Sequence, residues 1–214
     1  MELNLDPVEV RVLGALIEKE IATPEYYPLS LNALVNACNQ KSNRDPMTAY
    51  GEDEVERALE SLRARGLALR STGAGSRVPK HAHRLTEQLN PDRREIAVLC
   101  ELMLRGPQTV GELRTHTERM HGFDDTGEVE ATLQRLMERE PAALAVGLPR
   151  RAGEKETRFA HLLSGAPVQA EPEPAEAPPA RHDRVGELER KVEDLQREME
   201  FLRSQFADFR RQLE

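Results

Sequence analysis

The sequence lacks tryptophan, and only 4% of its 214 residues are aromatic. Its hydrophobic cores must therefore be built from leucine, valine, isoleucine and alanine, which is typical of small helical domains. It also lacks any apolar run near the roughly 18 residues that a membrane-spanning helix needs, and residues 1–7 lack the basic start and apolar stretch of a signal peptide. We therefore expect a cytoplasmic protein without a membrane partner.

Cysteine is scarce as well. The two cysteines, Cys38 and Cys100, lie in different halves of the chain, and each belongs to a helical apolar pattern. One cysteine per half excludes a disulfide within either half, so we expect two reduced, buried thiols.

Catalytic patterns are also missing. No Gly-rich phosphate loop, nucleophile elbow or paired-acid arrangement occurs. Two histidine pairs, His81 with His83 and His116 with His121, lack a third and fourth ligand at a recognisable spacing. We expect no enzyme activity, no cofactor and no metal site, and a metal-binding enzyme is only a distant alternative.

The most informative feature that is present is a repeat. The segment 54–62 (EVERALESL) returns as 128–136 (EVEATLQRL). Each copy continues through a strand-like run and a Gly-bearing hairpin to a similar closing phrase, 82–85 (AHRL) and 160–163 (AHLL). Two copies, each about as long as a small independent fold, indicate a duplicated domain rather than a solenoid.

Each copy predicts three helices followed by a two-stranded hairpin. In the first, Asp6 and Glu9 make a capping box around the first helix, and Gly66 ends the third helix in a left-handed conformation. In the second, Asn90 and Pro91 take the places of Asp6 and the proline after it. Three helices and a hairpin make a winged helix, a helix-turn-helix variant that commonly contacts DNA.

The fold class is therefore mainly α with small β-hairpins. We predict winged-helix domains at residues 1–89 and 90–165, a Pro/Ala/Glu-rich linker at 166–182 and a coiled-coil helix at 183–214.

The last segment has apolar residues alternately three and four positions apart, as in the a and d positions of a coiled coil: Val185, Leu188, Val192, Leu195, Met199, Leu202, Phe206, Phe209 and Leu213. In a parallel pair Arg184 faces Glu189 of the partner, and Glu198 faces Arg203. This favours a parallel homodimer. A trimer, and a single helix that folds back on its own domains, stay open.

Longer motifs resemble a known family. The segment 23–44, which begins TPEYYPLS and ends NQKSNR, resembles the YceH family of bacterial proteins, and so do 104–106, 111–114 and 158–162. The resemblance covers Leu5 to Gly165. It implies a tandem winged-helix fold with a C-terminal coiled segment, and it implies no particular activity.

The charge distribution is unusual for a DNA-binding protein. Basic and acidic residues number 11 and 13 over residues 1–89, 11 and 13 over 90–165, and 8 and 12 thereafter. The third helices begin with carboxylates, in 52–56 and again in 124–130. Carboxylates at this end repel phosphates, which disfavours ordinary helix-in-groove binding, although they also complement the helix dipole.

Candidate contact residues gather elsewhere. They lie on the hairpins (Arg77, Lys80, Arg150, Arg151, Lys155 and Arg158) and in the loop before the third helix (Asn39, Gln40, Lys41, Asn43 and Arg44). Such residues can bind phosphates. They can equally be solvated strand edges, or a loop held by its own hydrogen bonds.

We therefore expect a dimeric, non-enzymatic binding protein. A DNA-binding or transcription-associated regulator that uses its hairpins and the 39–51 loop is the first hypothesis, and a protein adaptor or scaffold is the alternative. The 39–51 loop is longer than the matching loop at 121–125, which indicates that the first domain carries the specific recognition and the second mainly supports it, although an insertion without a role stays open. On this view, replacing residues 41–44 by glycine and serine leaves stability nearly unchanged.

Overall fold

The computed structural model describes residues 3–71, 78–150, 153, 155–165 and 199. Met1–Pro167 form one compact unit. The predicted linker and coiled coil lie outside the described residues, except for Met199, which is helical. The boundary between residues 89 and 90 falls inside the compact unit, so the division into two separate domains stays a prediction.

The two repeats contain the same main elements in the same order. The first contains α1 (Pro7–Ala22), the 3-10 turn η1 (Pro24–Tyr26), β1 (Leu29–Ser30), α2 (Leu31–Cys38), α3 (Glu52–Ala64), β2 (Ala68–Ser71) and β3 (Lys80–His83). A short helix, α4 (Leu85–Leu89), leads to the second, which contains α5 (Arg93–Arg105), α6 (Val110–His116), the 3-10 turn η2 (Thr117–Arg119), α7 (Thr126–Met137), β4 (Ala145–Gly147) and β5 (Phe159–His161).

Both sheets are small and antiparallel. The first has the strand order β1-β3-β2, and the second pairs β4 with β5. In the first hairpin Ala68 lies opposite His83, and Ser71 lies opposite Lys80. The described part of the chain is thus mainly helical with small antiparallel sheets, which confirms the coarse fold class predicted from the sequence.

The helix ends follow most of the predicted signals. Asp6 and Glu9 form the capping box of α1, and Gly66 has a φ of +73° after α3. The predicted equivalence of Asn90 with Asp6 is wrong, because α5 begins two residues later, with Asp92 as its N-cap. Asn90 instead ends α4 in a left-handed conformation. The short helix α4, which precedes Asn90, was not predicted from the sequence.

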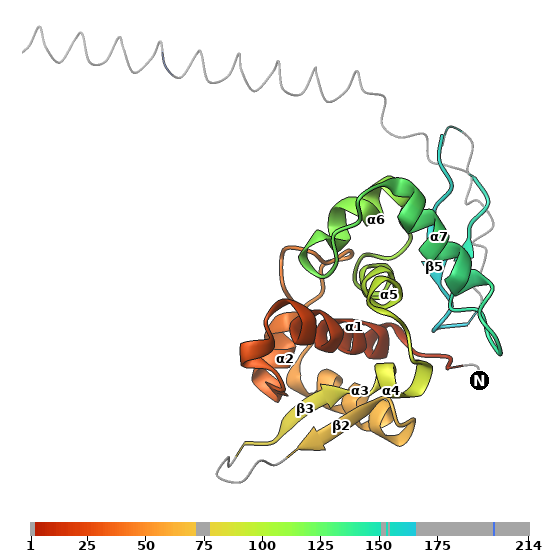
Figure 1. Ribbon diagram of the computed structural model, residues 1–214. Helices are drawn as coiled ribbons and strands as arrows, with labels where there is room; N and C mark the ends of the chain where they lie inside the picture. Colours follow the sequence, from red (N-terminus) through yellow and green to blue (C-terminus); the bar gives the residue numbers. More distant parts are fainter. Residues whose placement is uncertain (1–2, 72–77, 151–152, 154, 166–198, 200–214) are drawn as a thin grey trace, which may run out of the picture. The chain divides into compact units, whose positions relative to one another are not determined.

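The helices α1 and α5 lie side by side at the centre of the unit, with the rest of each repeat on the outer side of its own helix (Figure 1). Every residue from Glu9 to Glu18 of α1 and from Glu95 to Leu104 of α5 is buried. A helix that is buried on all sides packs against neighbours on every face, and for α1 and α5 one of these neighbours is the other repeat. The two repeats therefore share one hydrophobic core.

Close approach of the two helices depends on Gly14. A Cβ atom at this position would lie 2.9 Å from Cδ2 of Leu104, which is closer than packed carbons allow. Opposite, the Cys100 thiol donates a hydrogen bond to the carbonyl oxygen of Gly14 at 3.3 Å.

Both cysteines are free thiols inside the core. Burial raises the pKa of the Cys38 thiol to about 12 and raises the pKa of Cys100 as well. This agrees with the expectation of two buried, reduced cysteines.

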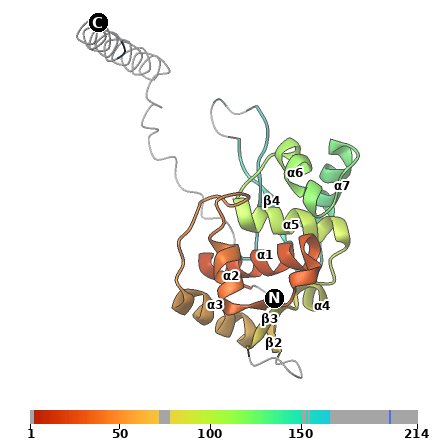
Figure 2. The same cartoon turned by 90° about the vertical axis from the view of Figure 1, so that its left-hand side faces the viewer.

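The two hairpins extend in opposite directions. The strands β2 and β3 lie at the bottom of the unit in Figures 1 and 2, and the described residues between β4 and β5 reach its top in both views. Among the residues that the structure describes, no helix is long and apolar enough to cross a membrane.

Candidate functional site

The loop between α2 and α3, residues 39–51, was the first predicted contact surface. Asn39 closes this loop from inside: its side-chain amide donates to the carbonyl oxygen of Tyr50, and its side-chain oxygen accepts from the Tyr50 amide, both at 2.8 Å. The side chain of Asn39 is therefore occupied by the loop's own backbone.

Arg44 is buried, with 5% of its surface exposed. Its Nη2 atom lies 2.6 Å from Oε2 of Glu18 in α1, and the same nitrogen donates to the carbonyl oxygen of Ala37 at 2.8 Å. Burial alone would raise the pKa of Glu18, but the hydrogen bond and charge of Arg44 outweigh it and hold that pKa below its usual value. The pair is a buried ion pair inside the first repeat.

Asn43 connects the loop to the second repeat. Its backbone is left-handed, with φ at +58°, and its Nδ2 atom donates to Glu18 and to Glu101 of α5, each at 3.1 Å. Its Oδ1 atom accepts a hydrogen bond from Nε of Arg105 at 2.9 Å. One amide therefore bridges carboxylates from both central helices.

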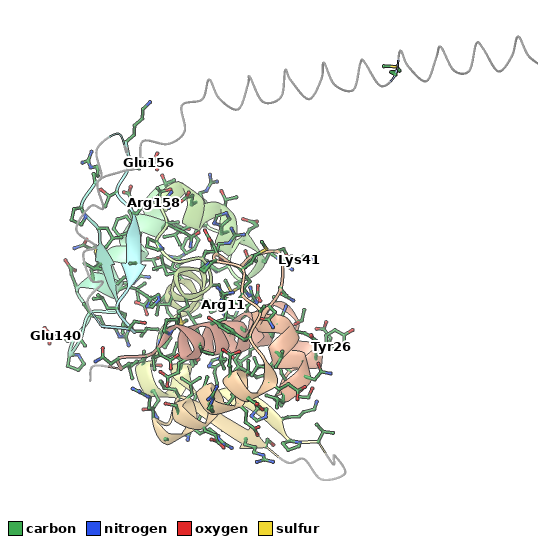
Figure 3. All side chains as sticks on the ribbon, turned by 180° about the vertical axis from the view of Figure 1, so that it is seen from behind. Arg11, Tyr26, Lys41, Glu140, Glu156 and Arg158 are labelled. Carbon is green, nitrogen blue, oxygen red and sulfur yellow. The ribbon has the colours of Figure 1, made fainter. Side chains whose placement is uncertain are left out.

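The other two predicted loop residues differ. Gln40 is half-buried and accepts a hydrogen bond from Lys19 at 3.3 Å. Lys41 is exposed, and Figure 3 shows it on the outer side of the loop, whereas Arg11 lies inside. Of the five predicted residues, only Lys41 is exposed to solvent. The other four hydrogen-bond within the first repeat, and Asn43 also joins it to the second.

Glu101 carries an unusual proton affinity. Its side chain is 1% exposed, and its Oε2 atom accepts no hydrogen bond even though Nε of Arg105 lies 3.4 Å away. Burial raises the pKa of Glu101 to about 7, although Asn43 and Arg105 lower it in part. This carboxyl therefore exchanges its proton near neutral pH.

The first hairpin carries cations on its surface. Arg70 of β2 is exposed, and Lys80 of β3 is half-buried near the end of the same hairpin. Burial and the charges of Arg63 and Arg70 lower the pKa of the neighbouring His81. Glu56 of α3 raises the same pKa in part, so charges of both signs lie near His81. Arg77 lies outside the described residues.

The second hairpin has two exposed cations, Arg150 and Lys155. Arg158 is instead used within the repeat, because its guanidinium donates to the carbonyl oxygen of Pro107 at 2.8 Å and pairs with Glu112 at 3.1 Å (Figure 3). Arg151 lies outside the described residues.

The exposed faces of the third helices are acidic, as the sequence predicted. On α3 the exposed carboxylates include Glu52, Asp53, Glu56 and Glu60. Some acids at these helix ends have structural roles: Glu54 accepts from the Gly51 amide at 2.8 Å. The remaining carboxylates face solvent and would repel phosphates.

The predicted histidine pairs do not meet metal-site geometry. His81 and His83 both point inward from β3, and His83 lies 2.6 Å from Glu20. His116 hydrogen-bonds Gln108, whereas His121 packs edge-on against Phe123. No group of three or more metal-binding side chains occurs within the described ranges.

A cleft between the repeats contains two residues that the sequence reasoning missed, Arg65 and Arg139. Each lies three positions after the last leucine of the repeated third-helix segment, Leu62 or Leu136. Aligning the two copies one turn further would have shown an arginine at the same place in both.

Comparison with known proteins matches this architecture to a family. The family model DUF480, described as a protein of unknown function, matches residues 5–154. The chain belongs to the DUF480 family.

The DUF480 relatives cover nearly the whole chain. A UPF0502 protein of Solibacter usitatus is 54% identical over 209 residues, which are 96% of this chain and all of the relative. UPF0502 proteins of Geobacter sulfurreducens and Koribacter versatilis are 51% and 53% identical, over the full length of both chains for the first and 91% and 92% for the second. These proteins are therefore similar to this chain along nearly its entire length.

We predict that Arg44→Ala lowers the free energy of unfolding by roughly 3–5 kcal/mol, because it leaves the buried Glu18 carboxylate without its partner. Lys41→Ala, in the same loop, should change it by less than about 0.5 kcal/mol. Urea unfolding measures both. If both variants lower the free energy of unfolding by a similar small amount, the prediction from the sequence is right and residues 41–44 do not contribute to stability.

A second prediction concerns pH. The pKa of Glu101 rises on folding from 4.5 to about 7, so the folded state keeps a proton that the unfolded chain has lost, and stability falls as pH rises between these values. Glu101→Gln mimics the protonated form. The difference in melting temperature between this variant and the natural protein should therefore increase from pH 5 to pH 8. The corresponding change in the free energy of unfolding is at most about 3 kcal/mol.

Glu130→Gln, an exposed position on α7, is the control for this measurement. It should shift the melting temperature equally at both pH values. A Glu101→Gln difference that does not change with pH would contradict the assignment of the proton to Glu101.

Proposed function

We propose that each repeat of this DUF480 protein is a winged helix. The order of α1, α2, α3 and the β2–β3 hairpin, repeated by α5, α6, α7 and the β4–β5 hairpin, supports this. The strand β1, which pairs with β3 beyond the hairpin, gives the first repeat the three-stranded sheet found in many winged helices.

We propose that the protein is a non-enzymatic, cytoplasmic, DNA-binding regulator whose hairpins lead the contact. The observation that supports this is the separation of charge within one repeat. Arg70 and Lys80 lie on the hairpin, whereas the outer face of α3 carries Glu52 and Glu56. A hairpin can follow the phosphate backbone or enter the minor groove without bringing the acidic start of α3 into the major groove.

The opposite directions of the two hairpins determine how DNA would be used (Figures 1 and 2). One straight duplex laid along the first hairpin leads away from the second. Each hairpin of one chain would therefore contact its own stretch of DNA, and the two contacts would contribute independently.

A protein partner is the second candidate. The specific observation in its favour is that α3 is an exposed helix whose solvent face carries four carboxylates, Glu52, Asp53, Glu56 and Glu60. Such a face suits a partner with a basic surface, because opposite charges steer association and disfavour nucleic acid. On this proposal the winged helices act as an adaptor, and the predicted coiled coil at 183–214 determines how many chains the oligomer contains.

We predict that random duplex binds to the full chain with an affinity that falls steeply with salt. Substituting Arg70→Gln with Lys80→Gln should lower affinity severalfold and reduce the salt slope by about 1–2, because phosphate contacts are lost. Glu56→Gln should tighten binding by removing repulsion. Fluorescence anisotropy at two salt concentrations measures all three.

The charge-matched control is Arg93→Gln with Arg119→Gln, which removes two exposed cations away from the hairpins. It should leave binding nearly unchanged. Equal losses from both pairs would indicate only a general effect of net charge. Absence of a duplex signal at either salt would favour the adaptor.

We also propose that the a and d residues Val185 to Leu213 form a parallel homodimer. Light scattering should give a dimer for the full chain and a monomer for residues 1–167, because that compact unit precedes the coil. Leu195→Asp in the full chain should also give a monomer. A dimer that persists without the coil would overturn this assignment.

A further inference from the structure

A cleft of about 320 Å³ opens between the two repeats, on the side where α3 and α7 end. Its apolar walls include Leu67, Leu89 and Leu144, and Arg65 and Arg139 contribute its cationic groups. This volume is at the lower end of the range for small-molecule sites, which lie preferentially where two structural units meet.

Each arginine contacts one buried glutamate and one backbone carbonyl oxygen, although through different nitrogens, and Nε of Arg65 also donates to Oγ of Ser61 at 3.5 Å. Arg65 follows α3, and its Nε atom lies 3.5 Å from Glu9, while Nη1 donates to the carbonyl oxygen of Leu3. Arg139 follows α7, and its Nη1 atom lies 3.3 Å from Glu95, while Nη2 donates to the carbonyl oxygen of Leu89.

These partners are themselves equivalent in the two repeats. Glu9 and Glu95 are the third residues of α1 and α5, where each completes a capping box. Both carboxylates are buried. The cleft therefore has an approximate two-fold arrangement in which each repeat supplies one anchored guanidinium.

Anchoring does not use every donor. Within the described part of the chain, Nη2 of Arg65 and Nε of Arg139 have no hydrogen-bond partner, and the two side chains are 36% and 24% exposed. Each guanidinium thus has nitrogens that contact protein and one nitrogen that no described group contacts, and both arginines line the cleft. A fixed guanidinium loses little side-chain entropy on binding, and its planar fork matches a carboxylate or a phosphate.

The charges of the cleft limit the size of the anion. Glu9 and Glu95 each neutralise one of the two arginines. Glu140, which is labelled in Figure 3, also lines the cleft and adds one negative charge. A polyanion such as a nucleic acid backbone would meet Glu140. A compact anion with an apolar body can pair with both guanidinium groups and place its apolar part against the leucine side chains of the cleft.

We propose that this cleft binds a small organic anion, a carboxylate or phosphate monoester with a compact apolar group, between Arg65 and Arg139. The ligand contacts both repeats, so it stabilises their junction by mass action. The site does not depend on DNA binding, and it is tested without DNA.

The test titrates the full chain with phenyl phosphate, benzoate, benzyl alcohol and inorganic phosphate, using isothermal calorimetry and the melting temperature. We expect phenyl phosphate or benzoate to bind at one site per chain and to raise the melting temperature. Benzyl alcohol lacks the anion and inorganic phosphate lacks the apolar group, so each should bind at least about tenfold more weakly. The stronger of the two organic anions identifies the head group.

Variants separate recognition from structure. Arg65→Gln with Arg139→Gln should weaken binding at least about tenfold, and Arg139→Lys, which keeps the charge and loses the fork, should weaken it as well. Arg135→Gln is the matched control, because Arg135 also contacts Glu95, at 3.4 Å, but does not line the cleft. It should bind the probe like the natural protein.

Three results would overturn the proposal. The first is that no organic anion binds. The second is that inorganic phosphate binds as tightly as phenyl phosphate, which would indicate adventitious anion pairing. The third is that Arg135→Gln weakens binding as much as Arg139→Lys, because the arginines would then act only through the fold.

Discussion

The packing of α1 against α5 is the constraint on which the rest of the structure depends. Each helix is covered by its own repeat on one side and by the other repeat's central helix on the other. Gly14 permits the close approach, and Cys100 completes the hydrogen bonding at the contact. Polar contacts then secure the two ends of this pair: Asn43 joins Glu18 to Glu101 at one, and Arg65 and Arg139 hold the helix starts at the other. The junction between the repeats is thus specific as well as apolar.

Local signals in the sequence predicted the local structure. The capping box of Asp6 and Glu9 placed the start of α1, and Gly66 ended α3, because these features depend on residues a few positions apart. The short helix α4 escaped prediction, since five residues give too little periodicity.

Tertiary features were harder to predict. Arg44 lies in a polar segment that looks exposed, and the acid that neutralises it, Glu18, is 26 residues away on another helix. Nothing local distinguishes a buried arginine from a solvated one. The burial of α1 on all sides did leave a signal, because residues 12–17 (VLGALI) are apolar without a break. An amphipathic surface helix would show polar positions there.

Several arginines use their guanidinium groups within the protein, so the number of arginines overstates the positive charge at the surface. Arg11 donates to the carbonyl oxygens of Cys38 and Pro46, Arg44 pairs with Glu18, and Arg158 joins Pro107 to Glu112. These three arginines therefore support the fold and are not available to an external partner. Other cations stay exposed, both on the hairpins (Arg70, Arg150 and Lys155) and away from them (Arg93 and Arg119), so net charge alone does not identify a contact surface.

The shared volume at Gly14 has a consequence for how the family can change over time. A residue larger than glycine at position 14 requires the Leu104 side chain in the second half to move or to be smaller, because the same space serves both. The central helices of the two similar halves therefore constrain each other. A substitution that fills this space from one helix is accommodated only with a matching change in the other.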